Sequence, residues 1–279
     1  MNEIIVKAPA KINLTLDITG RLENGYHTLE SVFQSVSLYD ELTVSLCGQE
    51  INVECDNGIA GGRDNICYKA AEVMARAADY SGGIFVGIRK NIPSEAGLGG
   101  GSSDAAAVML ALNELLGLDL SVDTLRAAAK PLGADVPFFI GAGAAHVTGI
   151  GDIISPAPAL RNVHIVLAKP ACGVSTPLAY RRLDEASSCS HGNIAAVLSG
   201  LERGDITAAA SGCVNSFEDV IGLPEVFEIK SALLSAGAEL ALMSGSGSAV
   251  FGIFTDIENA ERALEALRSC PFAGIYAPV

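Results

Sequence analysis

The chain has 279 residues, of which 49% are hydrophobic, and this is enough apolar material for one or two packed globular domains. Its formal net charge of −14 leaves no basic field that could hold a polyanion, so nucleic acid and an anionic membrane surface are not expected partners. A small anionic ligand remains possible, because a local loop can bind phosphate within an acidic protein.

The seven cysteines are widely spaced and form no CxxC pair, which argues against a disulfide framework and against a zinc site. The N-terminus has no apolar segment of signal-peptide length, and no uninterrupted apolar run approaches a membrane span. We therefore expect reduced thiols, a cytoplasmic location and no metal-ligand cluster.

The first informative segment alternates apolar and polar residues from Lys11 to Ile18, which predicts a β-strand. Lys11 and Asn13 share its polar face. That face is either the solvated side of a half-buried strand or part of a site, and the segment alone leaves both interpretations open.

A turn is predicted at Asn24-Gly25, and it places Tyr26 and His27 side by side just after it. An aromatic ring next to a titratable ring suits a heteroaromatic base, although such a pair can also serve packing alone. Further alternation predicts strands at 42–46, 51–55 and 84–88, and 65–78 is predicted as a helix. The N-terminal part is therefore expected to be α+β.

The most distinctive stretch is a glycine-rich loop that runs directly into the helix-forming segment from Ala105 to Leu112. Glycines allow positive φ and close approach of the backbone, and a helix start offers unpaired N–H groups and the positive end of the helix dipole. This arrangement predicts an anion site, usually for phosphate. The candidate residues are Ser94, Glu95, Ala96, Gly97, Leu98, Gly99, Gly100, Gly101, Ser102, Ser103 and Asp104.

Other interpretations of this loop must be weighed. A glycine cluster alone is compatible with a mobile surface loop. No lysine follows the glycines as the GxxxxGK[ST] motif requires, and the GxGxxG frame that begins at Gly97 has Ser102 where its last glycine should be. A phosphate site here would belong to another class.

We expect the helix after the loop to begin near Ser102 or Ser103, either of which can act as an N-cap, and to end before Gly117. Asp104 would then lie in the first turn, where its carboxylate suits the helix dipole but repels a bound phosphate. A Mg²⁺ ion that bridges phosphate oxygens would resolve this conflict.

A second predicted helix, Val122 to Lys130, leads to Asp135, which stands between Gly133 and Pro137 among apolar residues. Asp135 is either a capping residue or a positioned base, and the local sequence favours neither. Segment 155–158 marks a plausible domain boundary. Beyond it we predict strands at 163–168 and 249–254, helices near 193–202 and 224–236, a second glycine–serine loop at 243–248, and a helix capped by Asp256.

Taken together, the Ala8–Leu14 strand, the Gly-Leu-Gly-Gly-Gly-Ser-Ser-Asp loop and the late Ser-Gly-Ser-Gly-Ser loop resemble the GHMP small-molecule kinases. Asn24–His27 and Gly133–Phe139 resemble the branch of that family that acts on a cytidine diphosphate-linked methylerythritol. The resemblance implies an α+β, two-domain fold. Its N-terminal domain, 1–157, would be like ribosomal protein S5, and its C-terminal domain, 158–279, would be ferredoxin-like.

The resemblance also implies roles. ATP would be held by 94–104, and its γ-phosphate would pass to the 2-hydroxyl of the methylerythritol group. Asp135 would be the general base, and Lys11 its orienting and stabilising partner. Substrate contacts would come from Asn13, Tyr26, His27 and Tyr180, with His27 at the cytosine edge and the two tyrosines on opposite ring faces. Glu95 departs from the family pattern, which often has a small residue there.

Three alternatives remain. Another GHMP kinase, such as mevalonate or homoserine kinase, would share the glycine loop but would not need a cytosine-binding Tyr-His pair. A non-catalytic ATP-binding regulator could lose Lys11 or Asp135, yet both are present. A purely structural protein would have no reason to place two glycine–serine loops before secondary-structure elements.

Overall fold

The computed structural model describes residues 2–56, 61–141, 143–186 and 188–279. The chain forms two compact units, each built from separated stretches of sequence. Unit 1 comprises Met1–Ala10, Leu38–Ile92 and Gly99–Ala142, and unit 2 comprises Lys11–Ser37, Pro93–Leu98 and Gly143–Val279. Two long strands, β1 (Glu3–Arg21) and β2 (His27–Leu46), contribute to both units. The predicted boundary after residue 157 divides the chain into two domains that are each contiguous in sequence, which is a different division from these two units. That boundary stays a prediction.

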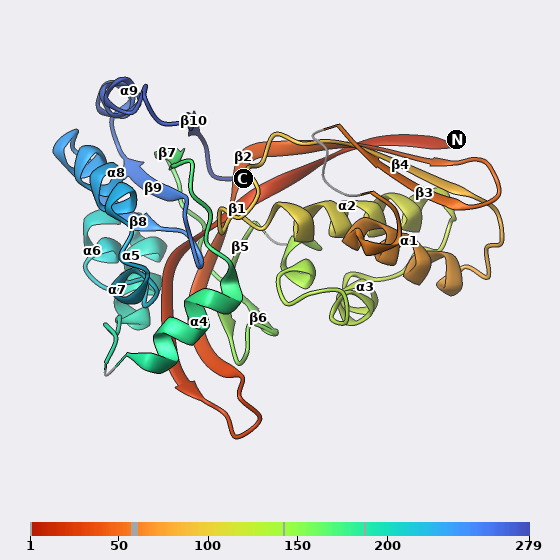
Figure 1. The fold of residues 1–279 in the computed structure, drawn as a ribbon, viewed down its shortest axis with the longest axis horizontal. Helices are drawn as coiled ribbons and strands as arrows, with labels where there is room; N and C mark the ends of the chain where they lie inside the picture. Colours follow the sequence, from red (N-terminus) through yellow and green to blue (C-terminus); the bar gives the residue numbers. More distant parts are fainter. Residues whose placement is uncertain (1, 57–60, 142, 187) are drawn as a thin grey trace. The chain divides into compact units, whose positions relative to one another are not determined.

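Unit 1 places helices along one side of a sheet (Figure 1). The sheet order is β3–β4–β2; β4 runs antiparallel to β2 with Leu42 opposite Ile88, and parallel to β3 with Val53 opposite Val86. The elements confined to this unit are β3 (Ile51–Cys55), η1 (Gly62–Asp64), α1 (Ile66–Ala77), β4 (Ile84–Arg89), α2 (Gly100–Leu115), α3 (Val122–Ala129) and η2 (Val136–Phe139). The predicted strands at 42–46, 51–55 and 84–88 are confirmed.

The core of unit 1 lies between its sheet and helices α1 and α2. Met74 of α1, Leu112 of α2 and Val86 of β4 are all fully buried. Burying a side chain of this size contributes about 1.5–3 kcal/mol to the stability of the fold. The alanines of α2 contribute in another way, because their small side chains let α1 pack closely against α2. Asn65 caps α1 by accepting a hydrogen bond from the N–H of Cys67 at 2.9 Å, as the predicted helix start at 65 implies.

Helix α2 begins earlier than predicted. Its N-cap is Gly99, with φ 72°, and no side chain caps it, so the expected serine cap is wrong. The physical reason is that glycine adopts the left-handed conformation at little cost and so turns the chain into the helix two to three residues sooner. Asp104 consequently lies beyond the first turn. At the other end, Gly117 has φ 61° and follows the helix as predicted.

Unit 2 contains a four-stranded antiparallel sheet with the order β10–β7–β9–β8. Its strands are joined in the sequence β7, helices, β8, β9, α9, β10, which is the β-α-β-β-α-β pattern of a ferredoxin-like fold. The other sheet of the chain has six strands: it continues from β3–β4–β2 through β5 to β6, and β1 also pairs with β2. The elements confined to unit 2 are β5 (Ala144–Thr148), β6 (Ile153–Pro156), β7 (His164–Lys169), α4 (Thr176–Glu185), α5 (Ile194–Arg203), α6 (Ile206–Ala210), α7 (Glu218–Ile221), α8 (Pro224–Ser235), β8 (Leu240–Met243), β9 (Val250–Phe254), α9 (Ile257–Ala266) and β10 (Phe272–Tyr276).

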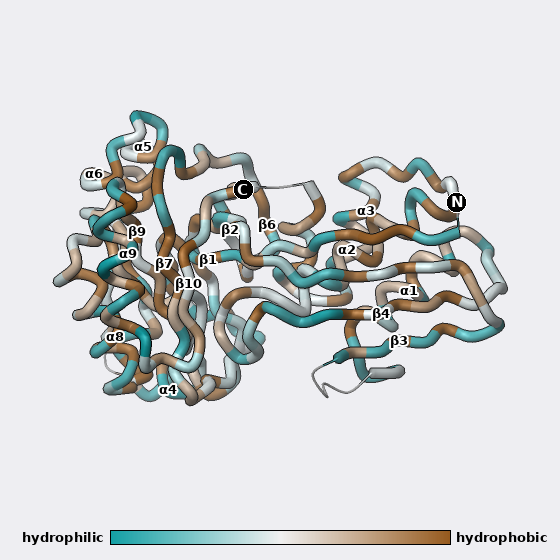
Figure 2. The backbone as a smooth tube through the Cα atoms, turned by 90° about the horizontal axis from the view of Figure 1, so that it is seen from above, coloured by the Kyte–Doolittle hydropathy of each residue, from teal (hydrophilic) through white to brown (hydrophobic). Residues whose placement is uncertain are grey.

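The core of unit 2 joins this sheet to α8 and α9. Strand β7 is hydrophobic between its polar ends, and β9 is hydrophobic as well (Figure 2). Val166, Phe254 and Leu233 are completely buried in one cluster. Asp256 caps α9 by accepting from the N–H of Glu258 at 2.9 Å, as predicted. The predicted strands and helices of this half are confirmed. The elements that were not predicted are β5, β6, α4, α6, α7, β8 and β10. Free thiols are found at Cys47, Cys67, Cys172, Cys189, Cys213 and Cys270. Among the described residues, no helix is long and apolar enough to cross a bilayer.

Candidate active site

Lys11 and Asn13 lie on one face of β1, as the alternation predicts, and they bind each other. Lys11, only 4% exposed, donates from Nζ to Asn13 Oδ1 at 2.6 Å and lies 4.6 Å from the centroid of the Phe33 ring. Asn13 in turn donates to Ser31 Oγ at 3.0 Å. This polar face is buried, so the interpretation as a solvated strand face is wrong. Burying an ammonium group is unfavourable without compensation, and the Asn13 oxygen and the Phe33 ring supply part of that compensation.

The first half of the glycine loop, 93–98, is held in unit 2 by the second glycine–serine loop. Ser244 Oγ donates to the carbonyl of Gly97 at 3.0 Å and accepts from the N–H of Asn13 at 3.2 Å. The N–H of Lys11 donates to the carbonyl of Leu98 at 2.9 Å. A Cβ on Gly97, which has φ 73°, would lie 1.9 Å from the carbonyl oxygen of Ser244. Only glycine fits here, because both the conformation and the space exclude a side chain.

Glu95 also occupies a left-handed conformation, with φ 51°, and its backbone carbonyl accepts from the N–H of Ser248 at 3.4 Å. Its carboxylate lies over Gly173, where an added Cβ would be 2.5 Å from Glu95 Oε2. Glycine at 173 therefore makes room for the carboxylate that departs from the family pattern. Left-handed backbone is unusual for glutamate, so the loop contacts must hold it in place.

The second half of the loop opens α2 in unit 1. The first N–H groups of a helix have no acceptor within the helix, and here they belong to Gly100, Gly101 and Ser102. Two buried oxygens nearby, Ser103 Oγ and Asp104 Oδ1, have no hydrogen-bond partner within the described residues. Buried polar atoms are normally hydrogen-bonded, so these two atoms make the start of α2 a candidate ligand site.

A buried ion cluster lies behind this helix start. Lys90 Nζ donates to Asp104 Oδ2 at 2.6 Å and also binds Asp40 Oδ2. Asp40, completely buried, accepts on its other oxygen from the N–H groups of Asn91 at 2.6 Å and Ile92 at 2.8 Å. The carboxylate of Asp104 is therefore compensated by a lysine, and the repulsion expected between Asp104 and a phosphate does not require Mg²⁺ for its relief.

Burial sets the electrostatics of this cluster. It raises the pKa of Asp104 to about 7; the charge of Lys90 opposes this rise and the charge of Asp40 adds to it. Burial tends to lower the pKa of Lys90, but Asp104 and Asp40 together outweigh burial and raise it. Burial, followed by the charge of Asp104, also raises the pKa of the neighbouring Cys67 thiol well above its usual value. The lysine is thus a permanent cation, and burial makes Asp104 harder to ionise than an exposed aspartate.

Asp135 lies in unit 1, at the residue that precedes η2. It is the N-cap residue of that turn, as one of the two interpretations expected, but its side chain makes no capping hydrogen bond to η2. The turn that carries it packs on α2, since a Cβ on Gly133 would lie 4.0 Å from Ser102 Oγ. The candidate base and the candidate phosphate helix are therefore neighbours within one unit. Lys11 belongs to unit 2, and its pairing with Asp135 stays a prediction.

The residues expected to contact a base, Tyr26, His27 and Tyr180, all belong to unit 2. His27 stacks on Tyr180 of α4, with ring centroids 4.8 Å apart and an interplanar angle of 24°. Tyr180 meets Phe217 edge to face at 5.0 Å. His27 Nε2 also lies 2.7 Å from Asp184 Oδ1. Tyr26 is 61% exposed, so its ring is accessible for stacking with a ligand.

The residues fit a nucleotide. The glycines, the open helix start and the orphaned Ser103 hydroxyl suit phosphate oxygens, and Asp104 Oδ1 suits an associated cation. Among the described residues, no three His, Cys, Asp or Glu side chains come together to hold a metal. A nucleotide-bound Mg²⁺ needs only one or two protein ligands, because phosphates and waters supply the rest.

Sequence reasoning missed Lys90, Asp40 and Asp184. Asp184 could have been found, since Ser175 followed by a proline at 177 is a helix-start signal that places Tyr180 and Asp184 one turn apart. Lys90 and Asp40 are 50 positions apart and carry no local signal.

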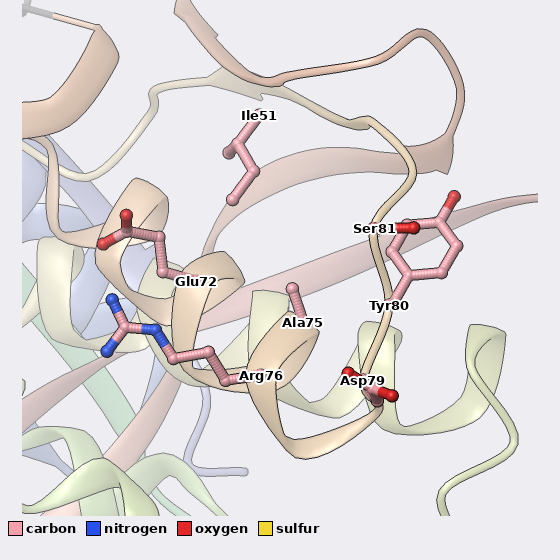
Figure 3. Close-up of a pocket in the computed structure, with 7 residues that line it drawn as sticks. All are labelled: Ile51, Glu72, Ala75, Arg76, Asp79, Tyr80 and Ser81. Atoms are coloured by element: carbon pink, nitrogen blue, oxygen red, sulfur yellow. The ribbon is translucent and has the colours of Figure 1, made fainter.

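A hollow of about 270 Å³ opens beside α1 in unit 1 (Figure 3). It is lined by Ile51, Glu72, Ala75, Arg76, Asp79, Tyr80 and Ser81. None of the candidate site residues lines it. The side chains of Glu72 and Arg76 lie together on one helix face, which is typical of a solvated surface.

Comparison with known proteins gives two family matches. The GHMP kinases N terminal domain matches residues 65–143, and the GHMP kinases C terminal domain matches residues 197–272. These ranges lie on either side of the predicted boundary.

Curated relatives match over almost their whole length. The 4-diphosphocytidyl-2-C-methyl-D-erythritol kinase of Syntrophotalea carbinolica is 43% identical, with 94% of this chain and 93% of the relative covered. The kinase of the same name from Desulfitobacterium hafniense (strain Y51) is 42% identical, with coverage of 94% and 90%.

Solved structures agree. A crystal structure of 4-(cytidine 5'-diphospho)-2C-methyl-D-erythritol kinase superimposes with a TM-score of 0.83 at 37% identity, covering 98% of this chain and 99% of the other. Homoserine kinase from Cytophaga hutchinsonii superimposes with a TM-score of 0.81 at 21% identity, covering 100% and 95%, which is a likeness of fold alone.

Proposed function

Because the chain belongs to the GHMP kinase family, we propose that it transfers the γ-phosphoryl group of ATP to the 2-hydroxyl of 4-diphosphocytidyl-2-C-methyl-D-erythritol, a step of non-mevalonate isoprenoid precursor biosynthesis. The observation that carries the proposal is the packing of the Asp135 turn on the open start of α2. The substrate is taken from the names of relatives about 40% identical over nearly the full chain.

Asp135 is the proposed general base. Phosphoryl transfer needs little covalent help, so most of the acceleration comes from positioning and from stabilisation of charge. An alcohol is a poor acid, and a carboxylate within hydrogen-bond reach contributes about 10²–10⁴-fold. Support for Asp135 comes from its place in the turn that packs on the start of α2.

Lys11 is the proposed partner of Asp135, orienting the carboxylate and stabilising negative charge that develops on the nucleophile. Its ammonium group is buried and is oriented by Asn13, which is fixed in turn by Ser31. Because the ammonium group of Lys11 is already oriented, it need not move when negative charge develops on the nucleophile. Asn13 is proposed to contact substrate as well.

ATP is the proposed second substrate, with its phosphates at residues 94–104 and its Mg²⁺ next to Ser103 and Asp104. The ion would neutralise phosphate charge during transfer. The chain's own residues contribute the rest: the loop backbone binds the phosphates, and Lys90 keeps Asp104 in place.

The cytidyl group is the proposed ligand of Tyr26, His27 and Tyr180. His27 would hydrogen-bond the edge of the base, while Tyr26 and Tyr180 would contribute aromatic faces. Support comes from the stacked pair of His27 and Tyr180 and from the exposure of Tyr26. We also propose a cytoplasmic location, in keeping with the cysteine usage of the sequence.

A coupled assay of ADP release tests the proposal against 4-diphosphocytidyl-2-C-methyl-D-erythritol, mevalonate and homoserine. We expect turnover with the first substrate alone, and loss of that turnover in Asp135→Asn. Turnover with mevalonate or homoserine instead would move the chain to another branch of the family. Silence with all three, together with retained ATP binding, would favour a regulator.

A further inference from the structure

His27 is held by a residue that plays no part in the function proposed above. Its side chain, 9% exposed, has Nε2 at 2.7 Å from Asp184 Oδ1. The two residues are 157 positions apart and come from β2 and α4. The second oxygen of Asp184 lies 3.4 Å from Nη2 of Arg21. The carboxylate is thus fixed on both sides.

The ring plane of His27 is fixed too. Tyr180, one turn before Asp184 on α4, stacks on it, and Phe217, 2% exposed, supports Tyr180 edge to face. A single helix therefore holds the imidazole by its face and by one edge. Within the described residues, the bond to Asp184 is the only hydrogen bond of this ring.

This arrangement determines which nitrogen of His27 carries the proton. An ionised carboxylate can only accept hydrogen bonds, so Nε2 must donate. In the neutral ring, Nδ1 is then left as an acceptor. In the neutral ring, the Nδ1 edge therefore offers a lone pair and not an N–H group.

We propose that Asp184 is a positioning residue that fixes His27 in its Nε2–H tautomer and thereby makes the site select cytosine over uracil. The acceptor at Nδ1 complements the 4-amino group of cytosine, a donor, and repels the 4-oxo group of uracil, an acceptor. This inference rests on the proposed function, because it assumes that His27 meets the edge of the base.

The test uses Asp184→Asn in the full-length protein, with Glu185→Gln as its matched control. The control removes the same charge from the next, exposed residue of α4. Asparagine keeps the shape of Asp184 but can donate as well as accept, so it no longer dictates the tautomer.

The first readout is the long-range ¹H–¹⁵N correlation spectrum of the imidazoles, which distinguishes protonated from unprotonated nitrogens. The chain has four histidines, and the spectrum of His27→Gln identifies the signals of His27. We expect a single Nε2–H tautomer in the wild type and in Glu185→Gln, and a tautomer mixture in Asp184→Asn. An unchanged tautomer in Asp184→Asn would overturn the inference.

The second readout is kcat/KM for the cytidyl substrate and for its uridyl analogue. Losing one hydrogen bond that favours cytosine over uracil should change the ratio of the two kcat/KM values by about tenfold. We expect Asp184→Asn to lose about tenfold in cytidyl-over-uridyl selectivity through KM, with KM for ATP unchanged. Unchanged selectivity would overturn the inference even if overall activity fell.

The two proposals can fail separately. If the wild type phosphorylates neither substrate, the proposed function fails. The spectrum and the binding of CDP against UDP, measured by calorimetry, then decide the inference alone. Equal affinity of the wild type for CDP and UDP would overturn it, and a CDP preference that is lost in Asp184→Asn would sustain it.

Discussion

Replacing Asp104 with asparagine isolates the titrating member of the buried ion cluster. Asparagine resembles the protonated carboxyl in size and charge, and the Lys90–Asp40 pair keeps its own contact. Burial raises the pKa of Asp104 from 3.8 to about 7. Around pH 5.5, the folded protein therefore still holds a proton that the unfolded chain has released.

The sign and size of the effect follow from this difference. A raised pKa in the folded state contributes stability that is complete below the ordinary pKa and is lost as pH rises through the folded value. Between about pH 5.5 and about pH 7, the free energy of unfolding of the wild type falls by about 1.4 kcal/mol per pH unit, or about 2 kcal/mol in all, and then levels off. Asp104→Asn lacks this slope.

Thermal unfolding followed by circular dichroism measures the difference. For a chain of this size, about 2 kcal/mol corresponds to roughly 4–8 °C in Tm. We expect the Tm of Asp104→Asn, relative to wild type, to rise by that amount between about pH 5.5 and about pH 8.5. Glu114→Gln, on the exposed side of the same helix, is the control and should show no pH-dependent difference. A constant difference across this range would mean that Asp104 is ionised throughout, and the reasoning would be refuted.

The Asp135→Asn protein should fold and bind ATP but lose phosphoryl transfer by about 10²–10⁴-fold in single-turnover assays; near-native turnover would rule Asp135 out as the base. Gly97→Ala places a Cβ 1.9 Å from an opposing carbonyl oxygen and should raise KM for ATP at least ~10-fold, whereas Gly48→Ala, with a similar φ of 75° and no atom within 4 Å, should show only the left-handed strain of about 1 kcal/mol in unfolding. Equal effects of these two changes on KM would show that space at the loop is irrelevant. Tyr26→Ala and His27→Ala should raise KM for the cytidyl substrate and leave KM for ATP nearly unchanged, and a matching rise for ATP would mean that the two sites have been confused.

Strand and helix patterns could be predicted because they depend on neighbours in sequence. Alternation predicted that Lys11 and Asn13 share a face, and the structure joins them by a hydrogen bond. An aspartate before an amphipathic run predicted the cap of α9. What these patterns could not decide is which face is buried, because burial depends on segments that pack from elsewhere in the chain.

Long-range polar contacts could not be predicted in the same way. Lys90 follows a strand and reads as an ordinary surface lysine, yet its side chain is 7% exposed between two carboxylates. Asp40 follows Tyr39 within the long strand β2, and nothing in the sequence around it indicates that its side chain is completely buried. The start of α2 was predicted too late for another reason. Serines are good N-caps, but Gly99 adopts the left-handed conformation, so the helix already begins at Gly100.

The hydroxyl of Ser244 joins Asn13, near one end of the chain, to Gly97 in its middle. On a ribosome, the N-terminal strand and the glycine loop emerge long before the serine that ties them together. The loop therefore receives these contacts only after residue 244 has been made, and we expect a chain that stops short of Ser244 to lose the proposed nucleotide site. Binding of a nucleotide would then report that the chain has been made and has folded at least as far as Ser244.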